Sequence, residues 1–441
     1  MRGNVQLATY LSELFVKPFL ATSGSESANS FLNLAIALVI IIVAAKLGGY
    51  ISLRLKQPSV LGELIVGLLL GPTLLDMLNW RVFLYSSAIN SEVLLSEIKA
   101  LAEIGVLLLM FIAGLDLHLS DLAKSGKAAS LAGTFGVILP LVLGFGTGVL
   151  YDFGTEEAIF IGLVLAATSV SISAQTLMEL GKLRTRVGIS LLGAAVFDDI
   201  LVILGISVFF ALSLGSGGSL GSVLLILVKM VLYLVAASAF GFYLLPRLTT
   251  IVDNLPVSKG LMAFVFITML LFAWLAEVLG GMAPITGAFL AGLFFARSPL
   301  QHRIEQEIST VAYGLFVPIF FVSVGLEANL RVFTIGIAGL LVVLTLVAIL
   351  GKVLGSGLGA RLAGFNNRES LQMGVGMMSR GEVGLIVANQ GITTGMIGVD
   401  IFSAIVGVVL ITTLLTPILL RRLFAEGQSE QKFVQESNQG A

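Results

Sequence analysis

The feature that most constrains the fold is a succession of long apolar stretches, separated by short polar breaks, that begins at Phe31. Each stretch has about 17–25 residues, the length that a helix needs to cross the hydrocarbon core of a bilayer. Apolar residues make up 57% of the 441 residues and charged residues only 12%, about half the charged share of an ordinary soluble domain. The sequence therefore predicts an all-α polytopic membrane protein. It excludes a soluble enzyme, a disordered chain and a nucleic-acid-binding protein.

Taking each stretch as one helix gives about thirteen transmembrane spans. We place them at 31–55, 60–78, 97–117, 126–150, 155–180, 186–213, 219–247, 258–280, 283–297, 308–330, 332–361, 369–392 and 398–420. The ninth stretch is short, so a re-entrant segment is an alternative there. Residues 1–30 are expected to form an N-terminal extracytoplasmic segment that ends in a loop over 21–30. Residues 31–422 are expected to form the transmembrane domain, and 423–441 a short cytoplasmic tail with only about one helical turn.

The basic residues predict the orientation of the chain. Sixteen of the 25 Lys and Arg residues fall on the side of the first loop between spans, five on the opposite side, and four within spans. Since cytoplasmic loops carry an excess of Lys and Arg, the N-terminus is expected outside and the C-terminus in the cytoplasm. The chain has no cysteine, which excludes disulfides, thiolate metal sites and cysteine nucleophiles.

Two consecutive segments recur in the second half of the chain. The second span contains Gly62-ELIV-Gly67 and the ninth contains Gly287-AFLA-Gly292, while the third and tenth spans end in the similar sequences GLDL and GLEANL. In the predicted topology the two copies, about 60–213 and 283–422, are antiparallel, and inverted repeats are typical of alternating-access transporters. Chance similarity between glycine-spaced apolar helices is the alternative.

Adjacent carboxylates, Asp198 and Asp199, lie at the centre of the sixth span. One ionised carboxylate at that depth costs at least ~2.5–3.5 kcal/mol, so a function is expected for them, against the alternative of purely structural salt bridges. Lys352 lies within the eleventh span among small residues that allow another helix to approach closely. We expect it to pair with one aspartate, rather than to extend to the membrane surface.

Two spans are predicted to be interrupted at their centres. The fifth carries four hydroxyl residues between Thr168 and Ser173, including Ser169, and the twelfth carries Arg380 and Glu382. Positions two apart do not face each other on a regular helix, so Arg380 and Glu382 pair only if the helix breaks, or else each has another partner. We expect two discontinuous helices that cross, with these charges balancing the partial charges of the helix ends. Ordinary hydrogen bonding of the hydroxyls to their own helix is the alternative.

Taken together, six motifs resemble the bacterial monovalent cation:proton antiporters, on the branch of the NapA-type sodium/proton antiporters and the Kef potassium-efflux systems. The motifs are GELIVGLLLGP (62–72), EIGVLLLMFIAGLDL (103–117), AATSVSISAQTL (166–177), GAAVFDDI (193–200), FFVSVGLEANL (320–330) and SRGEVGLIVA (379–388). The resemblance covers nearly the whole chain from residue 31.

The resemblance implies an inverted-repeat fold like that of NhaA and NapA, with an ion-carrying core domain and a dimerisation domain, in a homodimer surrounded by lipid in the bacterial inner membrane. By position, Asp199 matches the ion-binding aspartate, Asp198 the aspartate that pairs with Lys352, and Thr168 and Ser169 the first crossing. Arg380 and Glu382 match the charged pair of the second crossing. Kef-type members have a glutamine-aspartate pattern where this chain has Asp198-Asp199, and they carry a nucleotide-binding domain that is not expected here.

The expected function is exchange of cytoplasmic Na⁺ (or Li⁺) for external H⁺ without a cofactor, in the service of pH homeostasis and with net charge movement. Na⁺ and H⁺ would compete for Asp199, with Asp198 and Thr168 as further oxygen ligands of Na⁺. Exchange of K⁺ for H⁺, or a Kef-like K⁺ efflux channel component, is the alternative. An ATP-driven pump is a weaker alternative, because the sequence has no GxxxxGK[ST] motif.

Overall fold

The computed structural model describes residues 26–80, 83, 91–213, 220–328, 331 and 335–439, and within these ranges the chain forms helices and no strands. Helices satisfy the backbone hydrogen bonds that lipid cannot satisfy. The helices form two groups that differ in their packing partners.

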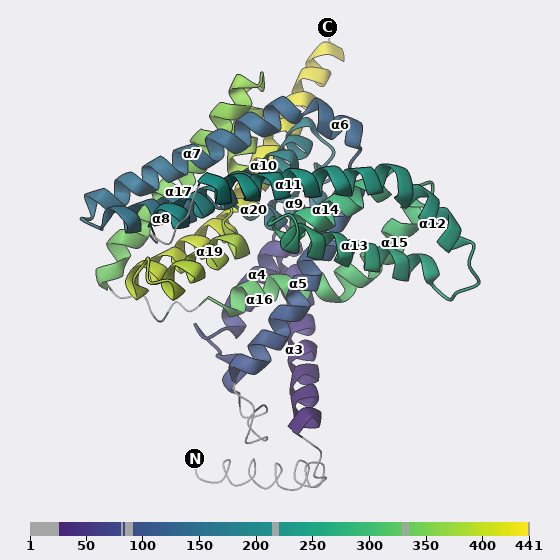
Figure 1. Ribbon diagram of the computed structural model, residues 1–441, viewed down its shortest axis with the longest axis horizontal. Helices are drawn as coiled ribbons and strands as arrows, with labels where there is room; N and C mark the ends of the chain where they lie inside the picture. Colours follow the sequence, from purple (N-terminus) through teal and green to yellow (C-terminus); the bar gives the residue numbers. More distant parts are fainter. Residues whose placement is uncertain are drawn as a thin grey trace.

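The first group, which we call the site bundle, surrounds the contact between α7 and α17. Its members are α7 (Gly126–Leu150), α8 (Thr155–Ala166), α9 (Ser171–Glu179), α10 (Arg186–Ser213), α17 (Ile335–Leu362), α18 (Asn367–Gly376), α19 (Gly381–Thr393) and α20 (Val399–Gln439). Helix α7 packs on α8, α10 and α17, and α20 packs on α17 and α19. Figure 1 shows α7, α8, α17 and α19 together on one side of the molecule.

The second group, the scaffold bundle, is built on the pairs α3–α4, α4–α16, α5–α14 and α13–α14. Its members are α3 (Glu26–Arg54), α4 (Ser59–Leu70), α5 (Ser91–Leu115), α13 (Gly260–Val278), α14 (Pro284–Phe295), α15 (Gln301–Val311) and α16 (Val317–Leu326). The connecting helices are α6 (Leu119–Lys124), α11 (Leu220–Ala239) and α12 (Leu245–Asp253), and a 3-10 turn covers Met77–Asn79. Single π-helical turns, Phe240–Leu244 and Ala312–Phe316, join α11 to α12 and α15 to α16.

Glycines let the helices of the scaffold bundle cross closely, in a reciprocal pattern. Gly67 of α4 lies against the backbone of Val322 on α16, and Gly292 of α14 lies against the backbone of Phe111 on α5. A Cβ at either glycine would overlap the facing backbone. Thus the α4 segment of the first predicted repeat packs on the second, and the matching α14 segment of the second packs on the first. This reciprocity agrees with the predicted internal repeat.

Glycines also bring α17 against α7 in the site bundle. Gly355 and Gly359, one turn apart on α17, face the backbone carbonyls of Phe135 and Leu131 on α7. No room for a Cβ remains at either glycine. Lys352, which lies three residues before Gly355 on α17, is completely buried.

Several expected boundaries differ from the observed ones. Ten helices among the described residues are long and apolar enough to cross a membrane, whereas the sequence predicts about thirteen spans. The shorter apolar helices α4 and α14 correspond to the second and ninth expected spans, and the separate helices α18 and α19 to the twelfth. The count of thirteen therefore stays a prediction.

The second expected span, 60–78, is too long. Helix α4 ends at Leu70, and its C-cap Gly71 is extended, because the proline that follows at position 72 disfavours a helical conformation in the residue before it.

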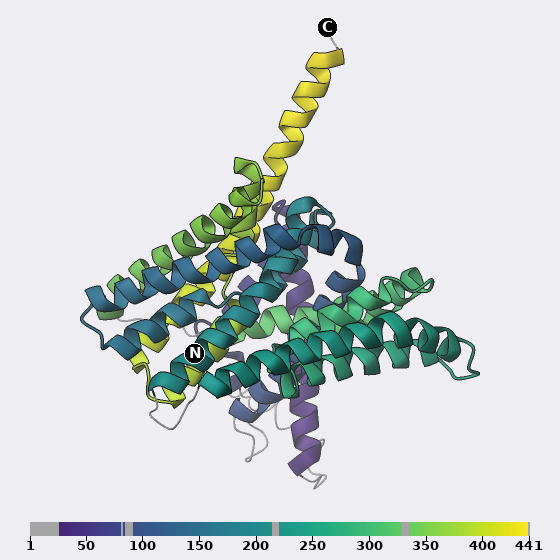
Figure 2. The same ribbon diagram turned by 45° about the horizontal axis from the view of Figure 1, so that its top comes forward.

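The ends of the chain also differ from expectation. Helix α3 begins at Glu26, so a loop over 21–30 is wrong for residues 26–30, while residues 1–25 lie outside the described ranges. Helix α20 continues to Gln439 and projects alone from the other helices (Figure 2). A single turn beyond Arg422 is therefore wrong, and the Glu-, Gln- and Lys-rich sequence of this segment explains the longer helix.

Candidate functional site

Two helices of the site bundle are interrupted and cross, as the sequence predicts. The first break separates α8 from α9, and the second separates α18 from α19. The backbone N–H of Ser169 in the first break donates to the carbonyl of Ser379 in the second at 2.9 Å. The Ser173 hydroxyl donates to the carbonyl of Gly376, the last residue of α18, at 2.6 Å. The four short helices therefore end against one another inside the bundle.

Arg380 lies beside the C-terminal end of α8. One guanidinium nitrogen donates to the carbonyl of Ala167, the C-cap of α8, and another donates to the carbonyl of Ala348 on α17, both at 2.9 Å. The side chain is buried, and it makes no ion pair within the described part of the chain. Because a helix C-terminus carries a partial negative charge, the positively charged guanidinium compensates that charge at the end of α8.

Glu382 lies at the opposite kind of helix end. It is in the first turn of α19, and its carboxylate accepts hydrogen bonds from the hydroxyls of Ser169 at 2.7 Å and Ser171 at 3.1 Å. Ser171 is also the first residue of α9. The carboxylate thus sits near the N-termini of two helices, which carry partial positive charge. Arg380 and Glu382 bind these separate partners rather than each other.

Asp198 and Lys352 form an ion pair that is closed to solvent. Asp198 lies at the middle of the 28-residue helix α10, Lys352 lies on α17, and both side chains are fully buried. The Lys352 ammonium donates to one carboxylate oxygen of Asp198. The other carboxylate oxygen has no hydrogen-bond partner among the described residues. This is the contact expected between the sixth and eleventh spans.

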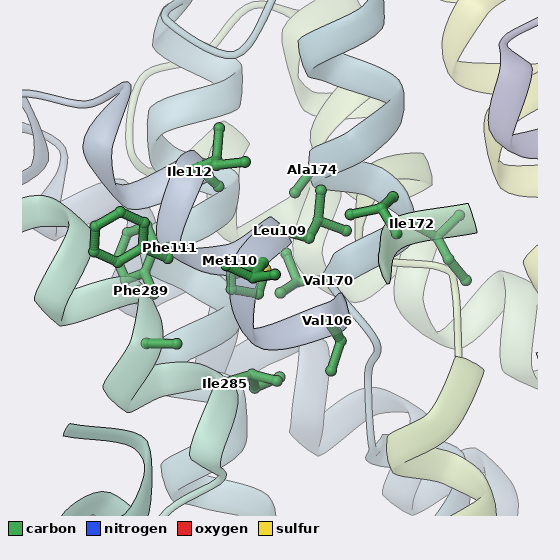
Figure 3. Close-up of a cluster of buried hydrophobic side chains, with 14 of the residues drawn as sticks. Val106, Leu109, Met110, Phe111, Ile112, Val170, Ile172, Ala174, Ile285 and Phe289 are labelled. Atoms are coloured by element: carbon green, nitrogen blue, oxygen red, sulfur yellow. The ribbon is translucent and has the colours of Figure 1, made fainter. Parts of the chain in front are cut away.

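Asp199 is turned towards the scaffold bundle. It borders a narrow cavity that is lined from that bundle by Met110, Ile285, Thr286 and Phe289. The Thr286 hydroxyl donates to the Asp199 carboxylate at 3.2 Å. Figure 3 shows Met110, Val170 and Ile285, from three different elements, close together in the apolar wall beside this position. Asp199 is therefore a buried carboxylate with a largely apolar cavity in front of it.

The two hydroxyl residues that the sequence assigns to the ion site lie differently. Thr168 is buried, and its hydroxyl lies 3.5 Å from the carbonyl of Ala166. Ser169 donates to Glu382. Neither hydroxyl makes a hydrogen bond to Asp199 in the described structure. The neighbouring Val170 lines the Asp199 cavity instead, so the first crossing adjoins the cavity through an apolar side chain.

Thr286 is the site residue that sequence reasoning misses. It is a single hydroxyl in the short apolar helix α14, in the sequence APITGAFLAG. No neighbouring charge or hydroxyl marks it, and a lone threonine in such a helix usually bonds to its own backbone. Only the folded structure, in which the Thr286 hydroxyl meets Asp199 of α10, gives it a partner.

Acidic residues at matching positions of the two predicted repeats have basic partners. Asp116, after α5, pairs with Arg184, and Glu327, after α16, pairs with Lys99 at 3.3 Å. Among the described residues there is no cluster of three or more His, Cys, Asp or Glu side chains that could hold a resident metal ion.

Comparison with known proteins gives a consistent result. A sequence profile described as "Sodium/hydrogen exchanger, transmembrane" matches residues 20–426. The chain is 42% identical to a probable Na⁺/H⁺ antiporter, GerT, of Bacillus cereus over 88% of this chain and 98% of GerT. It is 39% identical to the Na⁺/H⁺-K⁺ antiporter GerN of the same organism, over 90% of this chain and 97% of GerN. The solved sodium/proton antiporter MjNhaP1 of Methanocaldococcus jannaschii matches 88% of this chain with a TM-score of 0.62 and 17% identity, and 96% of that chain is covered.

Proposed function

The chain belongs to the sodium/hydrogen exchanger family, and we propose that it exchanges Na⁺ or Li⁺ for H⁺ across the membrane, with Asp199 as the shared binding residue. It is a multi-pass membrane transporter with the all-helical fold of MjNhaP1. We place its C-terminus in the cytoplasm on the basis of the Lys and Arg distribution. We also propose that it works as a homodimer without a cofactor.

One observation carries the proposal: of two adjacent buried carboxylates, only one has a cationic partner within the described part of the chain. Lys352 neutralises Asp198, while Asp199 faces a cavity and accepts a hydrogen bond from the Thr286 hydroxyl. A carboxylate oxygen is a ligand that a hard cation prefers, and the same oxygen binds a proton. Na⁺ and H⁺ then compete for one residue, so only loaded forms of the site bundle cross between the two access states.

Lys352 supplies a second proton in this mechanism. Na⁺ at Asp199 attracts the adjacent Asp198 carboxylate and weakens its pairing with Lys352, which then releases a proton. Two protons for one Na⁺ move one net charge in each cycle, and each such charge gains ~2.3 kcal/mol per 100 mV of membrane potential. Thr168, or a carbonyl freed at the crossing, supplies a further oxygen when Na⁺ enters, and Arg380 and Glu382 hold the crossing open for it.

The test is transport by the purified protein in liposomes that contain a pH-sensitive dye. After an acid-inside gradient is set, addition of Na⁺ or Li⁺ outside is expected to raise the internal pH, while choline has no effect. Liposomes with an imposed membrane potential are expected to show a rate that depends on that potential. Absence of dye response to Na⁺, Li⁺ and K⁺ alike contradicts the proposal.

Exchange of K⁺ is the second candidate, because GerN, 39% identical, is named a Na⁺/H⁺-K⁺ antiporter. Addition of K⁺ in the same assay separates the two functions. A dye response to K⁺ at least as large as to Na⁺ favours K⁺/H⁺ exchange. A current far above carrier rates favours a channel instead.

A further inference from the structure

The hydrogen bond between Thr286 and Asp199 joins the two bundles. Asp199 belongs to α10, which packs on α7, whereas Thr286 belongs to α14, which packs on α5 and α13. Thr286 is the third residue of α14 and is almost completely buried. Its hydroxyl thus reaches across the contact between the bundles to the carboxylate that is proposed to bind the ion.

The remaining surroundings of Asp199 make this hydroxyl distinctive. Among the described residues, the charged groups that act electrostatically on Asp199 are Asp198 on its own helix, Glu382 on α19 and Lys352 on α17, and Lys352 is paired with Asp198. The side chains contributed by α5 and by the start of α9 are apolar, Met110 and Val170. Thr286 is therefore the polar group that the scaffold bundle presents to the carboxylate.

We propose that Thr286 is a latch residue: its hydroxyl holds the empty, ionised Asp199 against the scaffold bundle and is released when Na⁺ or H⁺ binds. The inference rests on the proposed function. A hydrogen bond to an ionised carboxylate is about twice as strong as one to a neutral group, so binding of a proton or Na⁺ weakens the latch. The hydrogen bond thereby keeps the empty site bundle from moving. If the empty carrier moved, Na⁺ could cross the membrane without the return of H⁺, and the exchange would no longer be coupled.

Thr286 is a positioning residue in this scheme, and its removal has a distinct kinetic effect. Loss of the hydroxyl destabilises only the empty form, so the site binds Na⁺ and H⁺ more tightly by the same factor. At alkaline pH, Na⁺ binds to the empty form, so the KM for Na⁺ falls. At acid pH, Na⁺ must displace a proton that is itself bound more tightly by the same factor, so the KM for Na⁺ stays unchanged. The expected factor is about tenfold, the order of one hydrogen bond to a charged group.

The experiment compares Thr286→Val with Thr286→Ser in liposomes across a range of pH. Valine keeps the shape without the hydroxyl, while serine keeps the hydroxyl. Thr286→Val is expected to lower the KM for Na⁺ about tenfold at alkaline pH, and to shift the pH profile of transport about one unit towards alkaline pH. Thr286→Ser is expected to restore both. Thr268→Val is the matched control, because the Thr268 hydroxyl, on α13, bonds to the carbonyl of Phe264 in its own helix.

Two outcomes overturn the latch alone. A higher KM for Na⁺ in Thr286→Val at every pH means that the hydroxyl binds the cation directly. A lower maximal rate with unchanged KM in both the Val and Ser variants means that Thr286 only supports packing. In both cases the wild-type protein still exchanges Na⁺ for H⁺, so the proposed function stands. A wild-type protein without exchange overturns the proposed function and the latch together.

Discussion

The two bundles of this protein bury polar groups in different ways. The charged residues that are buried among the described residues are Asp198, Asp199, Lys352 and Arg380 in the site bundle and Glu63 in the scaffold bundle. The site bundle satisfies its charges internally, with an ion pair and with the ends of broken helices. Glycine contacts between apolar helices hold both bundles together, but among the described residues the scaffold bundle buries a single charged residue, Glu63.

This difference supports the proposal that the site bundle, rather than the scaffold bundle, carries charge through the membrane. A group of helices that moves as a body must keep its buried charges paired within that body, since an unpaired charge costs several kcal/mol at that depth. A group of helices that stays in place needs only close packing. Asp199 departs from the rule, because its hydrogen-bond donor lies in the other bundle.

The largest effect is expected for Asp199→Asn. The amide keeps the shape of the carboxylate, but it has no negative charge with which to bind a proton or Na⁺. Exchange should therefore fall to the level of empty liposomes. The measurement is the dye response to Na⁺. The matched control is Asp152→Asn: Asp152 is exposed and has a positive φ of 56°, a conformation that asparagine accepts. Exchange at the wild-type rate in Asp199→Asn would mean that the ion site is elsewhere.

The next effect concerns the Asp198–Lys352 pair, which should contribute to stability only as a pair. Lys352→Gln leaves Asp198 buried without a cation and is expected to cost about 3–5 kcal/mol. The double variant Asp198→Asn/Lys352→Gln removes both charges and should recover most of that loss. Thermal unfolding of the purified variants measures this. Losses that simply add in the double variant would show that the two residues are not coupled.

Transport by the same variants sharpens the comparison. Lys352→Gln is expected to retain some Na⁺/H⁺ exchange, because Asp199 is intact, but to lose most of its dependence on membrane potential. Exchange that keeps the wild-type voltage dependence would remove Lys352 as a proton carrier while leaving its structural pairing untouched.

Much of the site bundle follows from its sequence, because buried charges are rare enough to be informative. Adjacent aspartates in one apolar stretch and a lysine in another leave few ways to pair. Hydroxyl residues and an Arg-Gly-Glu sequence at the centres of two spans likewise indicate broken helices. The expected second span is too long because it follows the apolar residues past Pro72, although that proline marks the end of α4.

Partners that are backbone atoms, or lone hydroxyls, do not follow from the sequence. Arg380 binds the carbonyls of Ala167 and Ala348, and every residue has a carbonyl, so no residue type marks the acceptor. Thr286 likewise becomes a partner of Asp199 only through the packing of helices that lie far apart in sequence. The sequence therefore identifies the buried charges, whereas the folded structure is needed to identify the groups that bind them.

The smallest effect is expected for the glycines. Gly355→Ala places a methyl group against the backbone carbonyl of Phe135 and should lower the thermal stability by about 1–3 kcal/mol, although alanine favours a helix by roughly 1 kcal/mol. Gly339→Ala, on the same helix with open space beside it, is the control and should gain stability. Gly67→Ala makes the equivalent overlap in the scaffold bundle. Both Gly355→Ala and Gly67→Ala are expected to lose stability. Only Gly355→Ala is also expected to lower the voltage dependence of exchange, because it displaces the helix that carries Lys352. Equal transport defects at both contacts would mean that the scaffold bundle shapes the ion pathway as directly as the site bundle does.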